Sequence, residues 1–182
     1  MNVYESCPTF VTPHFTLRLV REEDAPGLLA VYGDRAAQPY FNADNCTSDF
    51  CYTTLPQMQQ CVDMWLWSYR HGYFVRWTIL EGDTPVGTVE MFRRDNGEDG
   101  RGSGVLRVDV LSRLETADVF GELLETILLP MHEHFGCAAV LTKAAGFAQQ
   151  RQASLRAHGF LPAAPLTAHD GRPLGDYWVH RT

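Results

Sequence analysis

The sequence of 182 residues has no long hydrophobic run, no basic cluster at its N-terminus and no excess of positive charge. Its apolar stretches are short and interrupted, so none is long enough for a transmembrane helix. Residues 1–10 carry Glu5 and no basic cluster, which is unlike a secretory signal peptide. We therefore expect a cytoplasmic protein with no membrane partner.

The formal net charge of −7 argues against a nucleic-acid partner. A general nucleic-acid binder needs a stripe of Lys and Arg to neutralise phosphates. A nucleotide-like ligand held by a few backbone amides stays compatible with this charge. The acidic surface also gives a weak long-range preference for a cationic amine as substrate.

Cysteine is present in a pattern that indicates neither disulfides nor a metal site. There are five cysteines, and an odd number without a secretion signal favours free thiols. Cys46, Cys51 and Cys61 are near one another, but their spacing is not that of a zinc site and no histidine completes the set. We expect small buried side chains and no metal.

Length and composition indicate one globular domain spanning residues 1–182. The apolar fraction of 45% and the charged fraction of 20% are ordinary for such a domain. Hydrophobic periodicity predicts strands at 15–20, 73–80, 86–93, 105–111, 138–142 and 177–181. It predicts helices at 22–33, 55–69, 119–135 and 149–157. Pro130 should kink or break the third of these helices.

The connections between these elements predict the fold class. Residues 73–111 read as a meander joined by turns, which makes those strands antiparallel. The helix between Leu111 and Ala138 is long enough to cross over between two parallel strands. Segment 36–53 is expected to hold a short helix and a loop, and segment 95–104, with four glycines, a mobile loop. We predict an α/β (α+β) fold with a mixed, mostly antiparallel central sheet and helices on both faces.

Charged residues alternate along the three central strands. Arg76 lies on the first, Glu90 on the second, and Arg107 and Asp109 share a face of the third. If these faces coincide, two carboxylates and two guanidinium groups meet at the centre of the sheet. Glu90 or Asp109 would then be a candidate general base, its pKa raised by burial and restrained by the arginines. The alternative is a set of ion pairs that only helps to set strand register.

The element order and several short segments resemble the GCN5-related N-acetyltransferase (GNAT) superfamily over nearly the whole chain. The resemblance is to its ribosomal-protein alanine acetyltransferase branch, and the segments that carry it are Thr16–Leu19 with Glu22–Ala25, Trp77–Leu80 with Pro85–Val89, and Leu141–Lys143 with Ser154–Leu155 and His158–Phe160.

The resemblance implies an acyl-CoA-dependent N-acyltransferase that moves an acetyl group from acetyl-CoA to a primary amine of a small molecule or a peptide N-terminus. The cofactor would lie between parting strands at 105–111 and 138–142, with the thioester held by free amides near Val110 and Leu111. The start of the following helix would hold the pyrophosphate. Asp109, next to these amides, is the preferred base over Glu90.

The segment expected to bind the pyrophosphate departs from the family signature Arg/Gln-x-x-Gly-x-Gly/Ala. Arg113, Thr116 and Ala117 would be its cofactor-binding residues, but Thr116 stands at the first glycine position and the second glycine is also missing. Glu115 and Asp118 would repel a phosphate. Ser112-x-x-Glu115 also reads as a capping box, by which the helix satisfies its own N-terminus. Both interpretations stay open.

A second departure concerns the late helix. The family often has an asparagine at its start and a tyrosine before the Gly-Phe pair, where this chain has Ala148 and Leu155. No general acid is implied at those positions.

The acceptor site and the alternatives are less constrained. We expect Arg76 and Arg107 beside the substrate, and Trp67, which falls off the apolar face of its helix, in the acceptor pocket. The missing glycines and tyrosine favour a different function, a binding or regulatory module that has lost acetyl-CoA. A homodimer formed through the sheet edges is a third option.

Overall fold

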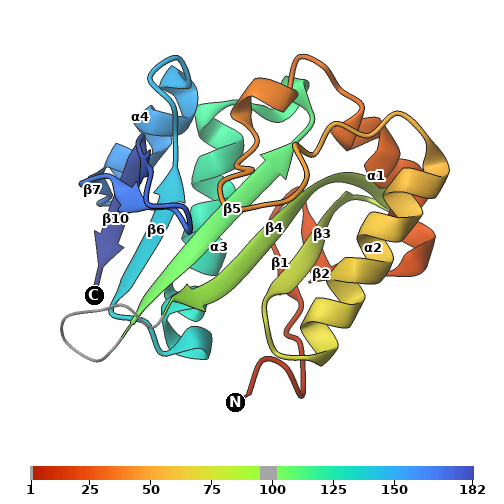
Figure 1. The fold of residues 1–182 in the computed structure, drawn as a ribbon, viewed down its shortest axis with the longest axis horizontal. Helices are drawn as coiled ribbons and strands as arrows, with labels where there is room; N and C mark the ends of the chain where they lie inside the picture. Colours follow the sequence, from red (N-terminus) through yellow and green to blue (C-terminus); the bar gives the residue numbers. More distant parts are fainter. Residues whose placement is uncertain (1, 95–101) are drawn as a thin grey trace.

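A central sheet of eight strands organises the protein (Figure 1). The computed structural model describes residues 2–94 and 102–182. The strand order is β1-β2-β3-β4-β5-β6-β10-β7, and β8 and β9 form a separate pair. In the described residues only β5 and β6 are parallel neighbours. The strands are β1 (Phe10–Val11), β2 (Thr16–Leu19), β3 (Val75–Glu81), β4 (Thr84–Arg94), β5 (Ser103–Val110), β6 (Ala139–Lys143), β7 (Leu161–Pro162), β8 (Leu166–Thr167), β9 (Pro173–Leu174) and β10 (Tyr177–Arg181).

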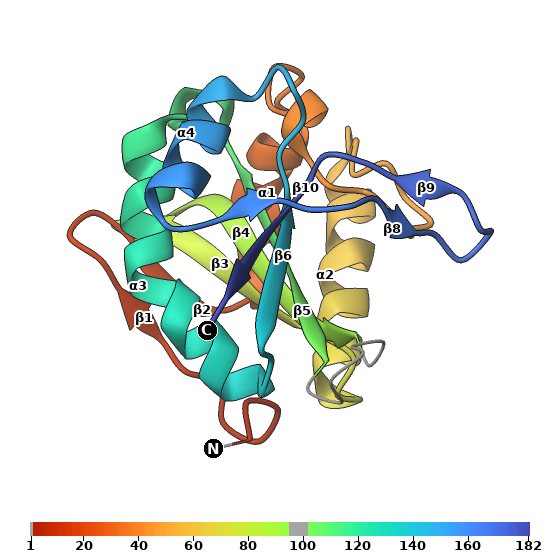
Figure 2. The ribbon, with the colours of Figure 1, turned by 90° about the vertical axis from the view of Figure 1, so that its left-hand side faces the viewer.

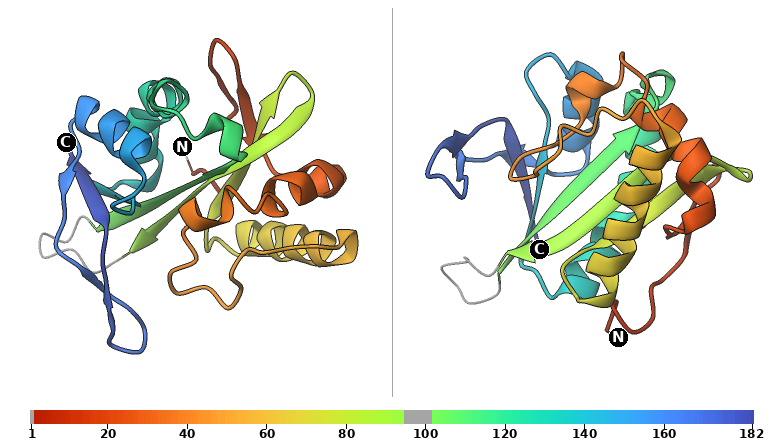
Figure 3. Two further views of the ribbon diagram at one scale, coloured as in Figure 1. Left: turned by 90° about the horizontal axis from the view of Figure 1, so that it is seen from above. Right: turned by 45° about the vertical axis from the view of Figure 1, so that its right-hand side comes forward.

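Helices cover both faces of this sheet, as Figures 2 and 3 show. One face carries α1 (Ala25–Tyr32) and α2 (Leu55–Arg70), and the other carries α3 (Ala117–Phe135) and α4 (Gln149–Ala157). Three short 3-10 turns, η1 (Glu22–Asp24), η2 (Gln38–Tyr40) and η3 (Ser112–Leu114), complete the described helical segments. In those segments no helix has both the length and the apolar character that crossing a bilayer requires.

The helix ends follow from local chemistry. Thr54 and Gln57 form a capping box at the start of α2, with two reciprocal side-chain to backbone interactions. Gly136 ends α3 in the left-handed conformation, at φ 59°, which glycine adopts without steric cost. Both helices then bury one apolar stripe, the pattern expected of helices that pack on a sheet.

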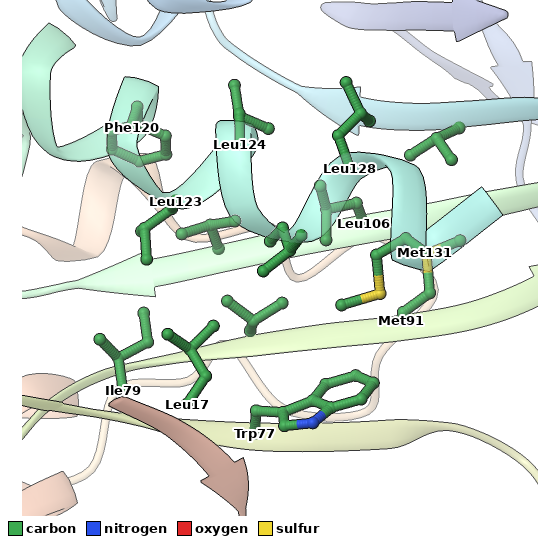
Figure 4. Close-up of a cluster of buried hydrophobic side chains, with 14 of the residues drawn as sticks. Leu17, Trp77, Ile79, Met91, Leu106, Phe120, Leu123, Leu124, Leu128 and Met131 are labelled. Atoms are coloured by element: carbon green, nitrogen blue, oxygen red, sulfur yellow. The ribbon is translucent and has the colours of Figure 1, made fainter. Parts of the chain in front are cut away.

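The larger core lies between the sheet and α3. Figure 4 shows side chains from the strands meeting side chains from the helix. The strand side contributes Leu17, Trp77, Ile79, Met91 and Leu106, and the helix contributes Phe120, Leu123, Leu124, Leu128 and Met131. A second core joins α1 and α2, with Tyr32, Met58 and Trp65 fully buried. Apolar strand residues thus fill the layer against α3, whereas the second core is built from the helices and the segments next to them.

Most of the predicted architecture is confirmed. The predicted strands and helices are present, the meander is antiparallel and the crossover joins parallel strands. Pro130 does not break α3, which runs through it as one helix. The short strands β1, β7, β8 and β9 were not predicted, because two residues carry too little periodicity. Most of the loop predicted at 95–104 lies outside the described residues, and its last two residues belong to β5.

Candidate functional site

β5 and β6 pair over four residues and then separate. The pairs run from Ser103–Ala139 to Leu106–Thr142, whereas β5 stays paired with β4 as far as Val110. Figure 1 shows the two strands diverging toward their C-terminal ends. This separation is the geometry that the resemblance implied for the two strands.

Val108 and Val110 direct their backbone N–H groups toward this opening. The Leu111 N–H donates to the Val86 carbonyl at 3.0 Å, and peptide groups point to alternate sides along a strand. Val110, opposite Gly87 of β4, therefore presents its N–H to the β6 side, as does Val108. The Leu111 amide was expected to be free, and that expectation is wrong because β4 already engages it.

The charged residues of the three central strands meet on the α1 and α2 face of the sheet. Arg76 is opposite Glu90, and Glu90 is opposite Arg107, so the strand register itself brings them together. Glu90 forms ion pairs with both Arg76 and Arg107, the second at 2.7 Å between Nη1 and Oε1. The predicted coincidence of faces is confirmed. The guanidinium of Arg76 also lies 4.0 Å from the centre of the Trp65 ring, a favourable cation–π contact.

Asp109 lies in the same cluster but is enclosed by other side chains. The Tyr32 hydroxyl donates to its Oδ2 at 3.1 Å, and Nη1 of Arg76 is 3.6 Å from the same oxygen. Its other oxygen, Oδ1, has no hydrogen-bond partner among the described residues. Burial raises the pKa of the Asp109 carboxyl, and the nearby positive charges of Arg76 and Arg151 oppose that rise. Asp109 is thus a basic carboxylate at a closed position.

A pocket of about 620 Å³ opens on the α2 side of the sheet, next to the separation of β5 and β6. Arg107 lines it and is the first residue of β5 beyond the last pair with β6. Glu90 also lines it, whereas Asp109 does not. The remaining lining comes mainly from the loop before α2, the two residues before β3, the end of β4, the β8–β9 hairpin and Tyr177.

One wall of this pocket is fixed to three strands through Asp44. Lys143 of β6 pairs with the Asp44 carboxylate at 2.8 Å, and the Tyr177 hydroxyl of β10 donates to it at 3.1 Å. Arg107 of β5 donates to the Asp44 carbonyl at 2.7 Å. Burial raises the pKa of Tyr177 to about 12, so this hydroxyl stays protonated and continues to donate at neutral pH.

The other predicted substrate residues lie near the pocket or beneath it. Arg76 is buried below Glu90 and is not part of the lining. Trp67 is 45% exposed and also lies outside the lining, but its ring centre is 5.5 Å from that of Tyr73, which lines the pocket. Arg107 is the substrate candidate that reaches the pocket directly.

Comparisons with known proteins identify the fold. No protein-family model matches the sequence, and neither does any curated protein. Among solved structures, the chain is similar to a protein described as a ribosomal-protein-serine acetyltransferase from Vibrio cholerae, with a TM-score of 0.72, 15% identity and full coverage of both chains. RimL, a ribosomal L7/L12 alpha-N-protein acetyltransferase in complex with coenzyme A, matches with a TM-score of 0.71 and 12% identity over 94% of this chain and 96% of that one. AAC(6')-Ib in complex with paromomycin and acetyl-CoA matches with a TM-score of 0.66 and 14% identity over 92% and 93%.

The chain has the GNAT fold. At these identities the comparison establishes the architecture alone. Three parts of this GNAT fold are relevant to activity: the separation of β5 and β6, the pocket beside it, and the helix that follows β5.

In this GNAT fold the segment between β5 and α3 is organised differently from the expected capping box. Thr116, not Ser112, is the N-cap of α3, and its Oγ1 accepts from the Val119 N–H at 3.3 Å. The Ser112 N–H instead donates to Oδ2 of Asp34 at 2.8 Å. Glu115 turns inward, where it pairs with Arg151 at 2.5 Å. The predicted capping box is therefore wrong, because a 3-10 turn occupies residues 112–114 and shifts the helix start.

Two residues proposed for the cofactor already have partners within the chain. Arg113 pairs with Glu81 at 2.7 Å on the exposed surface. The Ala117 N–H donates to Oε1 of Gln150 in α4 at 3.2 Å. Surface contacts of this kind contribute little to the stability of the fold and can be replaced by contacts to a ligand. Neither contact by itself therefore prevents the cofactor from binding.

Four residues of the site region were not predicted: Tyr32, Asp44, Gln150 and Arg151. Arg151 left a usable signal, because it is three and four residues before the buried Ser154 and Leu155 and therefore shares their helix face. Tyr32, Asp44 and Gln150 left none, since their contacts join segments far apart in the sequence. Leu155, at the position where the family often has tyrosine, packs in the main core.

None of the cysteines in the described residues forms a disulfide. In the same residues no group of three or more His, Cys, Asp or Glu is arranged to hold a metal ion.

Proposed function

We propose that this chain is an N-acetyltransferase that transfers an acetyl group from acetyl-CoA to a primary amine. The observation that carries the proposal is the parting of β5 and β6 directly beside a pocket that contains Glu90. The GNAT fold shared with RimL and AAC(6')-Ib, whose structures contain coenzyme A or acetyl-CoA, supports it.

The part of the donor site between β5 and β6 fits a pantetheine arm. Val108 and Val110 offer uncharged N–H donors along the open edge of β5, and an acyl-pantetheine arm is rich in carbonyl acceptors. We assign the Val110 N–H as the donor to the acetyl carbonyl oxygen, where negative charge develops during transfer. When bound, acetyl-CoA would supply the acetyl group activated as a thioester.

Glu90 is the residue we assign to the acceptor amine. Glu90 lines the pocket with a side chain that is 2% exposed, and in this proposal its carboxylate receives the proton that the amine loses, directly or through one water. A nitrogen–carbon bond forms as the carbon–sulfur bond breaks, and the departing thiolate takes up one proton from solvent. Arg76 and Arg107 hold the Glu90 carboxylate in place, and Arg107 also contacts the pocket.

The acceptor is a primary amine on a small molecule or at a peptide N-terminus. RimL acts on the α-amino group of a ribosomal protein and AAC(6')-Ib binds an aminoglycoside, so both classes have precedent in this fold. The pocket of about 620 Å³ is large enough for either a short peptide end or a small molecule. Trp67 and Tyr73 extend its mouth with an aromatic surface.

A second candidate function is a binding or regulatory module without transfer activity. The specific observation in its favour is the start of α3, where Gln150 and Thr116 already satisfy helix amides. A homodimer and a cytoplasmic location stay predictions, and light scattering in solution would test the first of them.

Ligand-dependent melting separates the two functions. The melting temperature of the full chain is followed with acetyl-CoA and with S-acetyl-pantetheine, and acetyl transfer is followed by thiol release with a panel of amines. A ligand that binds only the folded state stabilises it by about 2.7 kcal/mol at about 100 times its Kd. We expect stabilisation and release of thiol. If neither thioester at millimolar concentration raises the melting temperature, the transferase proposal fails and the binding module remains.

A further inference from the structure

The donor site has two halves of unlike character. The half within the sheet, between β5 and β6, offers the Val108 and Val110 N–H groups and is backed by apolar core. The half at the start of α3 would face the diphosphate and the adenosine of coenzyme A. The first half has donors without partners within the described residues, whereas most donors of the second half are already committed.

Most of the backbone amides at the start of α3 are occupied by the chain itself; among those of residues 114–119, the Asp118 N–H is the one without a partner in the described residues. The Glu115 N–H donates to the Ser112 carbonyl and the Thr116 N–H to the Leu114 carbonyl. The Ala117 N–H donates to Gln150, and the Val119 N–H donates to Thr116 Oγ1. These are the amides through which a helix N-terminus ordinarily binds a phosphate.

The groove beyond this helix start is acidic. It has a volume of about 480 Å³ and lies between α3 and α4. Asp118, Glu122 and Glu125 line it, and no Lys or Arg is among the described residues that line it. His158 is its one titratable nitrogen group and lies 3.7 Å from Glu125. A nucleotide carrying phosphates would therefore meet carboxylates along this path.

Two guanidinium groups close to this helix start in the fold, those of Arg113 and Arg151, are also committed. Arg151 forms a buried pair with Glu115, so removing it from that carboxylate would leave a buried charge without its partner. Arg113 pairs with Glu81 on the surface. Because that pair is exposed, Arg113 is the one of the two that can be redirected at low cost.

We infer that this chain recognises its acyl donor through the acyl-pantetheine arm, and that the nucleotide end of coenzyme A contributes little to binding. The inference rests on the proposed function and narrows it: the donor class is an acyl-pantetheine thioester, of which acetyl-CoA is one member. The same bonds form and break whichever carrier holds the thiol.

Calorimetric titration of the full chain tests this directly. The ligands are coenzyme A, pantetheine and adenosine 3′,5′-bisphosphate, which represents the nucleotide end alone. We expect the Kd of coenzyme A and of pantetheine to agree within about tenfold, and no binding of the bisphosphate up to about 2 mM. A preference for coenzyme A above about tenfold, or measurable binding of the bisphosphate, overturns the inference.

Variants at the helix start provide a second readout. Gln150→Ala combined with Asp118→Asn frees one amide and removes one carboxylate at the groove. We expect coenzyme A to bind about fivefold more tightly while pantetheine is unchanged. Gln149→Ala, an exposed change one residue away, is the control and should alter neither Kd. Equal effects of the double variant on both ligands would count against the inference.

The outcomes distinguish this inference from the proposed function. Strong preference for coenzyme A removes the inference and leaves the transferase. Absence of binding by both coenzyme A and pantetheine removes the transferase and the inference with it.

Discussion

Glu90 and Asp109 lie on adjacent strands and on one face of the sheet, yet only one of them reaches the pocket. Glu90 lines the pocket between two guanidinium groups. Asp109 is enclosed beneath Tyr32, and its buried carboxyl has a raised pKa. Access to substrate favours Glu90, because a base has to come within hydrogen-bond reach of the proton it accepts.

Two amide substitutions test this assignment. Glu90→Gln should lower kcat/KM by about 100-fold or more, the range usual for loss of a general base. Asp109→Asn should keep kcat/KM within about tenfold, since that side chain supports Tyr32 and Arg76 from behind. Steady-state rates of thiol release measure both, with urea unfolding as the control for folding. A larger loss in Asp109→Asn would reverse the assignment.

Asp24 joins η1 to the sheet and makes stability depend on pH. Burial would raise the pKa of its carboxyl, but hydrogen bonds from Arg18, Thr78 and the Arg21 N–H outweigh burial and hold the pKa below the usual 3.8. The Arg18 contact is bidentate, at 2.7 and 2.8 Å. A carboxyl with a lowered pKa in the folded state stabilises it above the unfolded pKa, and this contribution is lost as the pH falls through the folded pKa.

We therefore expect Asp24→Asn to lower the free energy of unfolding at pH 7 by about 3 kcal/mol, because Arg18 keeps a largely buried charge without its partner. The difference between variant and parent should begin to shrink as the pH falls below about 4, near the unfolded pKa, and should continue to shrink through the lower folded pKa of Asp24. Urea unfolding at several pH values measures it. A difference that is constant from pH 7 to pH 3 would show that the charge of Asp24 is not responsible.

At the scale of elements, Gly87 allows β4 to approach the end of β5 closely. A Cβ at Gly87 would lie 2.5 Å from the Asp109 carbonyl oxygen and 2.8 Å from Cγ1 of Val110. Both neighbours belong to the part of β5 that has left β6. The glycine therefore fixes where the Val110 amide stands.

Gly87→Ala should lower the free energy of unfolding by about 2 kcal/mol, since a side chain forced into a packed interface typically costs this much. It should also weaken the binding of pantetheine. Gly146→Ala is a matched control, because a Cβ there meets nothing within 4 Å. Urea unfolding and calorimetric titration measure the two effects, and unchanged pantetheine binding in a destabilised Gly87→Ala protein would separate Gly87 from the donor site.

Pro130 is a second single residue that affects a whole element, the helix α3. It lies inside α3 and cannot donate a backbone hydrogen bond, although the helix runs on to Phe135. We expect Pro130→Ala to raise the free energy of unfolding by about 1–3 kcal/mol, because alanine restores the missing donor and favours helix. Thermal and urea unfolding measure this change. A loss of stability would mean that packing of the proline ring outweighs the restored bond.

The whole molecule carries 22 acidic and 15 basic residues, so its field repels anionic ligands. Salt screens this field, with a Debye length of about 30 Å at 0.01 M and about 10 Å at 0.1 M. Raising NaCl should therefore strengthen the binding of coenzyme A or leave it unchanged, while the neutral pantetheine is unaffected. A site that grips phosphates through cations would show weaker coenzyme A binding instead. Titrations across this range of salt decide between the two.

The net negative charge of the molecule repels an anionic donor but attracts a cationic acceptor. For a cationic amine, kcat/KM should fall as salt rises, because long-range attraction is screened. A small neutral acceptor serves as the control, and its rate should not change.

Two features could be predicted, because both follow from local periodicity. They are the order of the elements and the face of the sheet that carries Arg76, Glu90, Arg107 and Asp109. Strand alternation needs only neighbouring residues, and the short turn between β3 and β4 leaves little freedom in their register. Helix ends at Gly72 and Gly136 were likewise visible in the sequence.

Other features depend on how distant segments pack, and no local pattern encodes them. The Ser112-x-x-Glu115 pattern was misleading because Arg151 of α4 draws Glu115 inward and Asp34 takes the Ser112 amide. The choice between Glu90 and Asp109 depends on Tyr32, a residue of the first helix, covering one carboxylate and not the other. The engagement of the Leu111 amide depends on how far β4 accompanies β5. Side-chain periodicity therefore set which residues face each layer, whereas the opening between β5 and β6 and access to it arose only once the layers were assembled around it.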